Sequence, residues 1–182
     1  MRATDDVDLI VGLTGTAQWM QLQETLSKKG FTVSGDDDVI CRMRLGNLKA
    51  DFMPDDPNIL GFSNRWYKQG IYTAIKYALP SGRVIKHLTP PLFLATKMEA
   101  YGGRGQNDPL GSHDIINVVD GRPALLDEVQ ATPNEVRSYL SEQFQALLQH
   151  LDFENFLYGN IRGPDGRVEI VHQRVKALAE LV

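Results

Sequence analysis

Residues 5–12 read "DDVDLIVG", and this stretch decides the fold because acidic residues lead directly into an apolar run. The run Val7–Val11 predicts a β-strand. The period of two then places Asp6 and Asp8 on one face of the strand, about 6.5–7 Å apart at the backbone. Two carboxylates held at that distance repel each other unless a cation lies between them. The strand therefore predicts a metal site, and the alternative is a pair of solvated charges that protect the edge of a sheet.

A third carboxylate lies in "LKADFMP", residues 48–54. Asp51 alternates there with Ala50 and Phe52, which point to the opposite face of the predicted strand. Burying an unpaired charge is costly, so a carboxylate between apolar neighbours indicates a partner. If this strand pairs beside the first, Asp51 meets the acidic face of that first strand.

Mg²⁺ is the metal that these carboxylates favour, because it prefers oxygen ligands and is usually held by one or two carboxylates and substrate phosphates. Two such ions, about 3.5–4 Å apart, would activate an attacking hydroxyl and stabilise a leaving pyrophosphate. In that arrangement Asp51 is the third ligand, or the base that takes a proton from the hydroxyl. The carboxylates thus predict phosphoryl transfer.

The composition sets broad limits on the kind of protein. A chain of 182 residues with 42% hydrophobic and 23% charged residues is typical of one globular domain, alone or with a helical appendage. The net charge of −4 gives no sign of a general nucleic-acid binder. The single cysteine, Cys41, excludes an internal disulfide and is expected in the core. Without an apolar run of about 20 residues or a signal peptide, no membrane partner and a cytoplasmic location are expected.

The first half of the chain predicts a mixed sheet with one or two covering helices, which we assign to a domain over residues 1–88. Residues 16–29 predict a helix that ends at Gly30, and Gly46-Asn47 predicts a tight hairpin. Residues 55–66 are expected to form a loop. The expected strands are residues 7–11, 31–34, 39–46, 48–54, 70–80 and 83–88.

The second half, residues 89–182, predicts a helical region that packs on the sheet core. Thr132-Pro133-Asn134-Glu135 has the pattern of a capping box. The expected helices cover residues 90–102, 113–119, 132–150 and 168–181. Because the strands come first and the helices second, the fold class is α+β.

The first segment also resembles a known family. "RATDDVDLIV", residues 2–11, is similar to the strand motif of the nucleotidyltransferase superfamily, whose acidic–apolar–acidic triplet binds metal. The detailed similarity is to the AbiEii-like bacterial toxin nucleotidyltransferases, where Arg2-Ala3-Thr4 match residues that commonly precede the aspartates. "LTPPLFLATKMEAYGGRGQNDPLGSHDIINVV", residues 88–119, resembles the helical segment of that group.

The resemblance implies a nucleotidyltransferase-like fold and a Mg²⁺-dependent transfer of a nucleoside monophosphate from a nucleoside triphosphate to an acceptor hydroxyl. The acceptor is left open between an RNA such as tRNA and a small molecule, and a toxin–antitoxin system with an antitoxin partner is implied as well. The resemblance assigns catalysis and metal binding to Asp6, Asp8 and Asp51. It assigns nucleotide binding to Thr4, Lys97, Arg104 and Asp114, with Asp108 at the rim of the site.

One element of the family is expected to be absent from residues 1–88. The family carries a helix and a Gly-Gly or Gly-Ser turn that grips the triphosphate, and this element would precede Met1. A non-catalytic member of the fold is therefore an alternative, in which a partner or a second copy of the chain covers the sheet. A metal-dependent phosphohydrolase would use the same carboxylates.

Two groups of basic residues are candidates for binding RNA phosphates, and the alternative is that they form an ordinary solvated surface. For Lys97 the alternative is a solvated lysine, and for Asp114 it is a charge favoured at a helix N-terminus. His87 and His113 are expected to be structural or surface residues. The two basic groups are Arg83, Lys86, Lys97 and Arg104, and Arg162, Arg167, Arg174 and Lys176.

Overall fold

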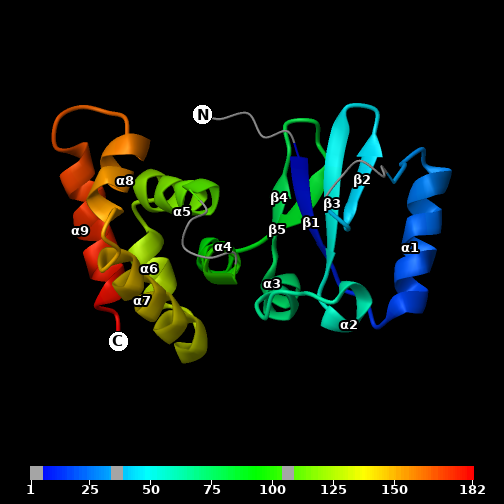
Figure 1. Ribbon diagram of the computed structural model, residues 1–182, viewed down its shortest axis with the longest axis horizontal. Coiled ribbons are helices and arrows are strands. Elements are labelled where there is room, and N and C mark those ends of the chain that lie inside the picture. Colours follow the sequence, from blue (N-terminus) through cyan, green and yellow to red (C-terminus); the bar gives the residue numbers. More distant parts are fainter. Residues whose placement is uncertain (1–5, 34–38, 104–108) are drawn as a thin grey trace. The chain divides into compact units, whose positions relative to one another are not determined.

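The computed structural model describes residues 6–33, 39–103 and 109–182 (Figure 1). Over these ranges the chain forms nine helices and two small sheets, which confirms the α+β class. The chain divides into two compact units between Tyr72 and Thr73, and each unit is described by itself. The division expected from the sequence lies after residue 88, because the strands expected at 70–80 and 83–88 are grouped there with the first sheet.

The first unit is a three-stranded sheet with helices. The strand order is β1-β3-β2, in which β1 is parallel to β3 and β2 is antiparallel to it. The expected strand at residues 7–11, the helix at 16–29 and the hairpin at Gly46-Asn47 are confirmed. The elements are β1 (Asp6–Val11), α1 (Thr16–Lys28), β2 (Arg42–Leu45), β3 (Leu48–Pro54), α2 (Pro57–Leu60) and α3 (Tyr67–Thr73).

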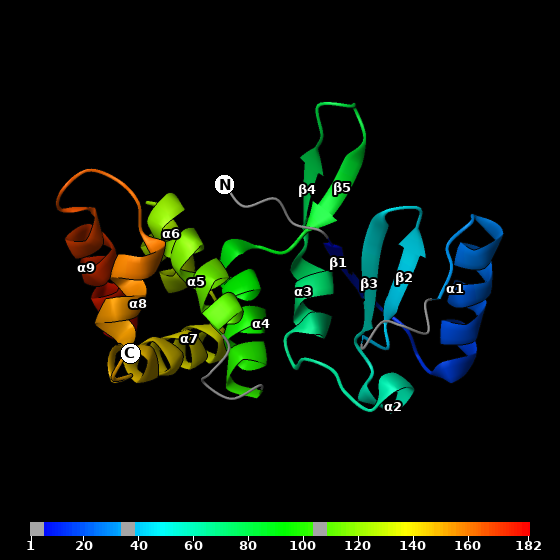
Figure 2. The same cartoon turned by 45° about the horizontal axis from the view of Figure 1, so that its top comes forward.

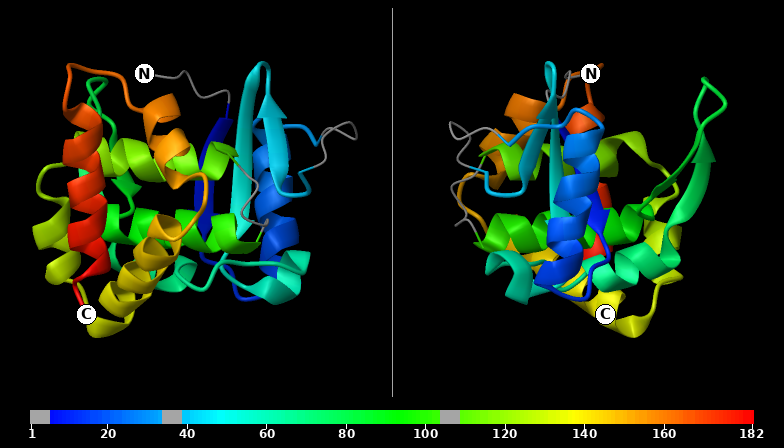
Figure 3. Two further views of the ribbon diagram at one scale, coloured as in Figure 1. Left: turned by 60° about the vertical axis from the view of Figure 1, so that its left-hand side comes forward. Right: turned by 90° about the vertical axis from the view of Figure 1, so that its right-hand side faces the viewer.

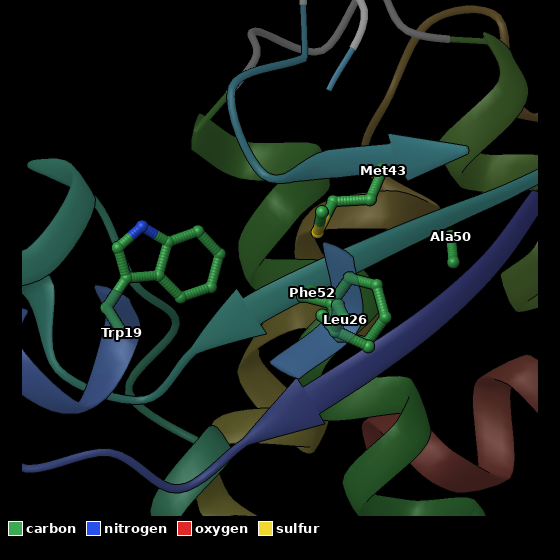
Figure 4. Close-up of a cluster of buried hydrophobic side chains, with 5 residues drawn as sticks. All are labelled: Trp19, Leu26, Met43, Ala50 and Phe52. Atoms are coloured by element: carbon green, nitrogen blue, oxygen red, sulfur yellow. The ribbon is translucent and has the colours of Figure 1, made fainter. Parts of the chain in front are cut away.

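Helix α1 packs on one face of this sheet. The helix ends where the N–H groups of Lys29 and Gly30 donate to carbonyls in its last turn, and Gly30 has a φ of 90° that favours glycine. Its apolar side chains meet those of β2 and β3 in one buried cluster (Figure 4). The polar side chains of the strands are consequently directed to the opposite face. The cluster consists of Trp19, Leu26, Met43, Ala50 and Phe52.

Three expectations for the first unit are corrected. Of the strand expected at 31–34, the described part contributes only an isolated bridge between Thr32 and Arg44. The expected loop at 55–66 contains α2, which Asp56 caps by accepting from the N–H of Asn58 at 2.9 Å. The stretch expected to be a strand from residue 70 begins as helix α3, because packing buries Tyr67 and Gly70 on one side of a helical turn.

The second unit is a hairpin followed by a group of helices. Figure 2 shows the β4–β5 hairpin extending away from α4, and Figure 3 shows α9 alongside α7. The hairpin is a separate antiparallel sheet, so the expectation that it extends the first sheet is wrong. The elements are β4 (Ile75–Ala78), β5 (Val84–His87), α4 (Pro90–Gly103), α5 (Pro109–Gly121), α6 (Leu125–Gln130), α7 (Asn134–Leu148), α8 (Phe153–Asn160) and α9 (Arg167–Ala179).

The helices of the second unit match the expectations in part. Helix α5 is longer than the expected segment 113–119, and α6 and α8 were not expected. The capping box is also wrong, because the Thr132 hydroxyl donates to the carbonyl of Val129 at 2.7 Å and Pro133 is the N-cap of α7. None of the helices in the described ranges combines the length and apolar character that crossing a membrane requires.

We predict that Trp19→Ala lowers the free energy of unfolding of the first unit by about 3–5 kcal/mol, because it leaves a cavity in the α1 cluster. Trp19 is 7% exposed, whereas its neighbour Met20 is 68% exposed. Met20→Ala is the matched control and should change the free energy by no more than about 0.5 kcal/mol. Denaturant titration followed by circular dichroism measures both, and equal effects would contradict the assignment of the core face.

Candidate functional site

The face of the first sheet opposite α1 brings the predicted carboxylates together. Asp8 of β1 lies directly opposite Asp51 of β3, and Asp51 lies opposite Arg42 of β2. Residues paired in this way share a face, and alternation along β1 places Asp6 on the same face as Asp8. The expected pairing of the two acidic strands is therefore present, while the roles of these residues stay predictions.

Arg42 joins the carboxylates of two strands. Its Nε donates to Oδ1 of Asp51 at 2.7 Å, and its Nη2 donates to Oδ2 of the same carboxylate at 2.7 Å. The same Nη2 also donates to Oδ2 of Asp6 at 2.9 Å. Bidentate, charge-assisted hydrogen bonds of this kind are among the strongest in proteins. One guanidinium thus ties β2 to both β3 and β1.

The members of this network differ in exposure. The side chains of Arg42 and Asp51 are 13% and 10% exposed, whereas that of Asp6 is 42% exposed. Asp8 is also exposed. Solvent therefore screens the Arg42–Asp6 bond more strongly than the Arg42–Asp51 pair.

The face also carries basic residues at its other end. Arg44 lies two residues beyond Arg42 on β2, and it is opposite Lys49 of β3. Lys49 is in turn opposite Asp6. By register the face therefore combines acidic and basic positions rather than acidic positions alone, which suits a ligand that has both a metal and phosphates.

The strand ends are fixed beside this face. The N–H of Asp55 donates to the carbonyl of Val11 at 3.1 Å, and its Oδ1 accepts from the N–H of Leu13 at 2.9 Å. On α3, the hydroxyl of the buried Tyr67 donates to the sulfur of Met53 at 3.1 Å. The two bonds of Asp55 hold the ends of β1 and β3 in the register that sets Asp8 against Asp51, and the bond of Tyr67 ties α3 to β3.

The carboxylate oxygens of the three aspartates suit Mg²⁺, but Arg42 binds some of these oxygens and fixes their positions. Carboxylate oxygens are the ligands that Mg²⁺ prefers, so the three aspartates fit the ion chemically. Within the described ranges, however, no three His, Cys, Asp or Glu side chains are gathered closely enough to hold a metal. Three carboxylate oxygens, two from Asp51 and one from Asp6, accept from Arg42 instead.

Cys41 lies next to Arg42 and responds to the same charges. It is 3% exposed, as expected for a core residue. Burial, and then the negative charge of Asp51, raises the pKa of the Cys41 thiol to about 11. The thiol is therefore neutral at ordinary pH.

In the second unit, two residues predicted to bind nucleotide form an ion pair. Nζ of Lys97 on α4 is 2.9 Å from Oδ2 of Asp114 on α5. The same Nζ lies 5.4 Å from the centroid of the Phe93 ring, within the range of a cation–π contact. The side chains of Lys97 and Asp114 are 24% and 46% exposed, so both reach solvent. Thr4, Arg104 and Asp108 lie outside the described residues.

Part of the second basic group has a structural role at the end of α5. Arg167 donates to the carboxylate of Asp120 at 2.6 Å and to its carbonyl at 3.1 Å. Arg174 donates to the carbonyls of Val119 and Asp120 at 3.0 and 2.7 Å. The last carbonyls of a helix lack partners within the helix, so these arginines cap α5. His113 pairs with Asn160 of α8, consistent with the structural role expected for it.

Sequence reasoning missed Arg42, although the sequence contained the information. Once Gly46-Asn47 is accepted as a two-residue hairpin turn, counting outward pairs residue 45 with 48 and residue 42 with 51. The partner that the buried Asp51 required is therefore the arginine at the corresponding position of the hairpin.

No protein-family model matches the chain. No curated protein matches it either. The similarity to the AbiEii-like group consequently stays a prediction based on the quoted motifs.

We predict that Asp51→Ala lowers the free energy of unfolding by about 3–5 kcal/mol, because it leaves the buried guanidinium of Arg42 without its bidentate partner. Asp6→Ala removes a single, more exposed bond from the same arginine and should cost about 1 kcal/mol or less. Denaturant titration of both variants gives the comparison. A larger effect at Asp6 would contradict the ranking of the two pairs.

We also predict that Cys41 reacts slowly with a disulfide reagent in the native protein. A pKa raised to about 11 keeps the nucleophilic thiolate scarce, and burial blocks access. The rate, followed by absorbance, should rise with pH through the range approaching that value. In denaturant, Cys41 should react as an ordinary exposed thiol. Equal rates in native and denatured protein at neutral pH would contradict this.

Proposed function

We propose that the chain is a Mg²⁺-dependent nucleotidyltransferase that moves a nucleoside monophosphate from a nucleoside triphosphate to an acceptor hydroxyl. The observation that carries the proposal is the pairing of Asp8 with Asp51 on adjacent parallel strands, with Asp6 on the same face. Two carboxylates from one strand and a third from its neighbour make an oxygen donor set suited to Mg²⁺. The quoted similarity to the AbiEii-like group adds support from the sequence.

Each residue has a proposed role. Asp6 and Asp8 hold the metal, and Asp51 is the third ligand or orients and deprotonates the acceptor hydroxyl. Bound Mg²⁺ would supply charge neutralisation at the phosphates and the leaving pyrophosphate. Lys97, oriented by its ion pair with Asp114, is proposed to neutralise phosphate charge. Thr4 and Arg104 keep the nucleotide-binding role that the resemblance implies.

The acceptor is proposed as an RNA such as tRNA, or as a small molecule with a hydroxyl group. A toxin that is controlled by an antitoxin protein is the biological setting that the resemblance implies. A metal-dependent phosphohydrolase differs only in using water as the acceptor, so the label of the transferred group distinguishes the two reactions.

A non-catalytic module is the second candidate, and one observation favours it. Helix α1 covers β2 and β3, but Val7 and Leu9 of β1 remain 45% and 40% exposed. A sheet with an uncovered apolar edge suits a protein that binds a partner or a second copy of itself. Such a module would hold its carboxylates through Arg42 permanently and would bind no nucleotide.

We predict that nucleoside triphosphate binds only in the presence of Mg²⁺, and that Asp8→Asn abolishes this binding. Asp8 is a proposed metal ligand, and an amide lacks the charge that holds the ion. Equilibrium dialysis with each labelled nucleotide and with or without Mg²⁺ measures the effect. Glu24→Gln is the control, because Glu24 is an exposed carboxylate on α1 that pairs with its helix neighbour Lys28.

Transfer is then followed with nucleotide labelled at the α-phosphate and bulk tRNA as acceptor. Label that enters RNA in the wild type and not in Asp8→Asn supports the transferase. Label recovered only as free nucleoside monophosphate identifies a hydrolase. A wild-type protein that binds no nucleotide at millimolar concentration would exclude the enzyme and leave the module.

A further inference from the structure

The guanidinium of Arg42 binds carboxylate oxygens that a metal on the acidic face would need as ligands. It donates hydrogen bonds to three carboxylate oxygens at 2.7–2.9 Å, two of Asp51 and one of Asp6. A Mg²⁺ ion lies about 2.0–2.1 Å from each ligand oxygen, which is closer than a hydrogen-bond donor. An ion on the same oxygens would lie against the guanidinium, and the two positive charges would repel each other.

The network offers one bond that is easier to release than the others. Asp51 holds Arg42 by two hydrogen bonds, and both side chains are largely buried, at 10% and 13% exposure. Asp6 holds the same arginine by a single bond from a carboxylate that is 42% exposed. Solvent can replace the bond to Asp6, whereas breaking the bidentate pair would leave buried charges without partners.

We propose that Arg42 competes with the divalent ion for Asp6, and that metal binding breaks the Arg42–Asp6 bond while Asp51 keeps its bidentate pair. Of the two roles proposed for Asp51, this arrangement keeps the second: Asp6 and Asp8 hold the ion, and Asp51 orients the acceptor hydroxyl through a remaining lone pair. The inference rests on the proposed function, since it concerns the same metal. In this arrangement Arg42 is a positioning residue. It holds the acidic face together before the metal binds, and it lowers the affinity of that face for metal alone.

The first test compares the metal affinity of three variants with that of the wild type. Arg42→Met removes the competing charge and keeps an apolar stem, so it should bind Mg²⁺, or Mn²⁺ as its probe, about tenfold more tightly or better. Arg42→Lys keeps the charge without the planar fork and should lie between the two. Lys28→Met removes an equal charge from α1 and should leave the affinity unchanged. Isothermal titration with Mg²⁺ and electron paramagnetic resonance with Mn²⁺ supply the affinities.

The second test uses the wild-type chain, because Arg42→Met leaves Asp51 without its partner and can destabilise the fold. Nitrogen-15 labelling of arginine gives side-chain resonances, and the signal that disappears in Arg42→Lys identifies Arg42. Addition of Mg²⁺ should shift that resonance and leave those of Arg122 and Arg137 in the second unit unchanged. Saturation with Mg²⁺ that leaves the Arg42 resonance in place would overturn the proposal.

The two tests separate this inference from the proposed function. If wild type and Arg42→Met bind metal with equal affinity through Asp8, the metal site stands and the competition is wrong. Weaker binding by a folded Arg42→Met would make Arg42 a support of the metal site, which also overturns the proposal. If no variant binds metal at millimolar concentration, the proposed function fails and the competition fails with it.

Discussion

The acidic face of the first unit depends on the bidentate pair between Arg42 and Asp51. Asp51 lies in the middle strand of the sheet and is only 7% exposed. Its charge is tolerated there because both of its carboxylate oxygens accept from the guanidinium of Arg42. The two-residue turn at Gly46-Asn47 places the arginine directly opposite the aspartate, so the pair forms whenever the hairpin takes this register. A one-residue slip would send Asp51 to the α1 face and into the apolar cluster. The pair and the core therefore select the same register.

Local patterns were sufficient to predict the elements that carry this face. Alternation in the first strand, the helical spacing of Trp19 and Leu26, and the hairpin turn each encode one element within a few residues, and the structure contains all three. The convergence of Asp8 and Asp51 required one further step, the parallel pairing of β1 with β3, which links segments separated by α1 and β2. That step was predicted from the chemistry of the carboxylates rather than from periodicity. It could equally have failed, because nothing local fixes which strands are neighbours.

The failures have a common physical cause, which is that packing decides between local structures of similar propensity. The stretch that begins at Gly70 has β-branched and aromatic residues, yet its first part is helical because Tyr67 and Gly70 are buried together. Helices α6 and α8 are short, and their apolar residues become a recognisable face only against the neighbouring helices. The prediction of the capping box failed for a similar reason, since the hydroxyl of Thr132 donates to the carbonyl of Val129 at the end of α6 and does not cap α7. By contrast, the ion pair of Lys97 with Asp114 joins residues that the sequence singled out for a different reason, and it gives each an alternative, purely structural role.

The arginine changes how the acidic face should be understood. Carboxylates that share one face of a sheet repel one another unless a positive charge lies among them. Arg42 supplies that charge from within the fold. It holds the buried Asp51 by two bonds and the more exposed Asp6 by one. The buried pair stabilises the hairpin, whereas solvent reaches the more exposed bond to Asp6. Under the proposed competition, the same side chain would stabilise the fold without a metal and would release Asp6 when the metal binds. An arginine suits this position better than a lysine, because its planar fork holds one carboxylate by two parallel bonds while it also donates to a second carboxylate.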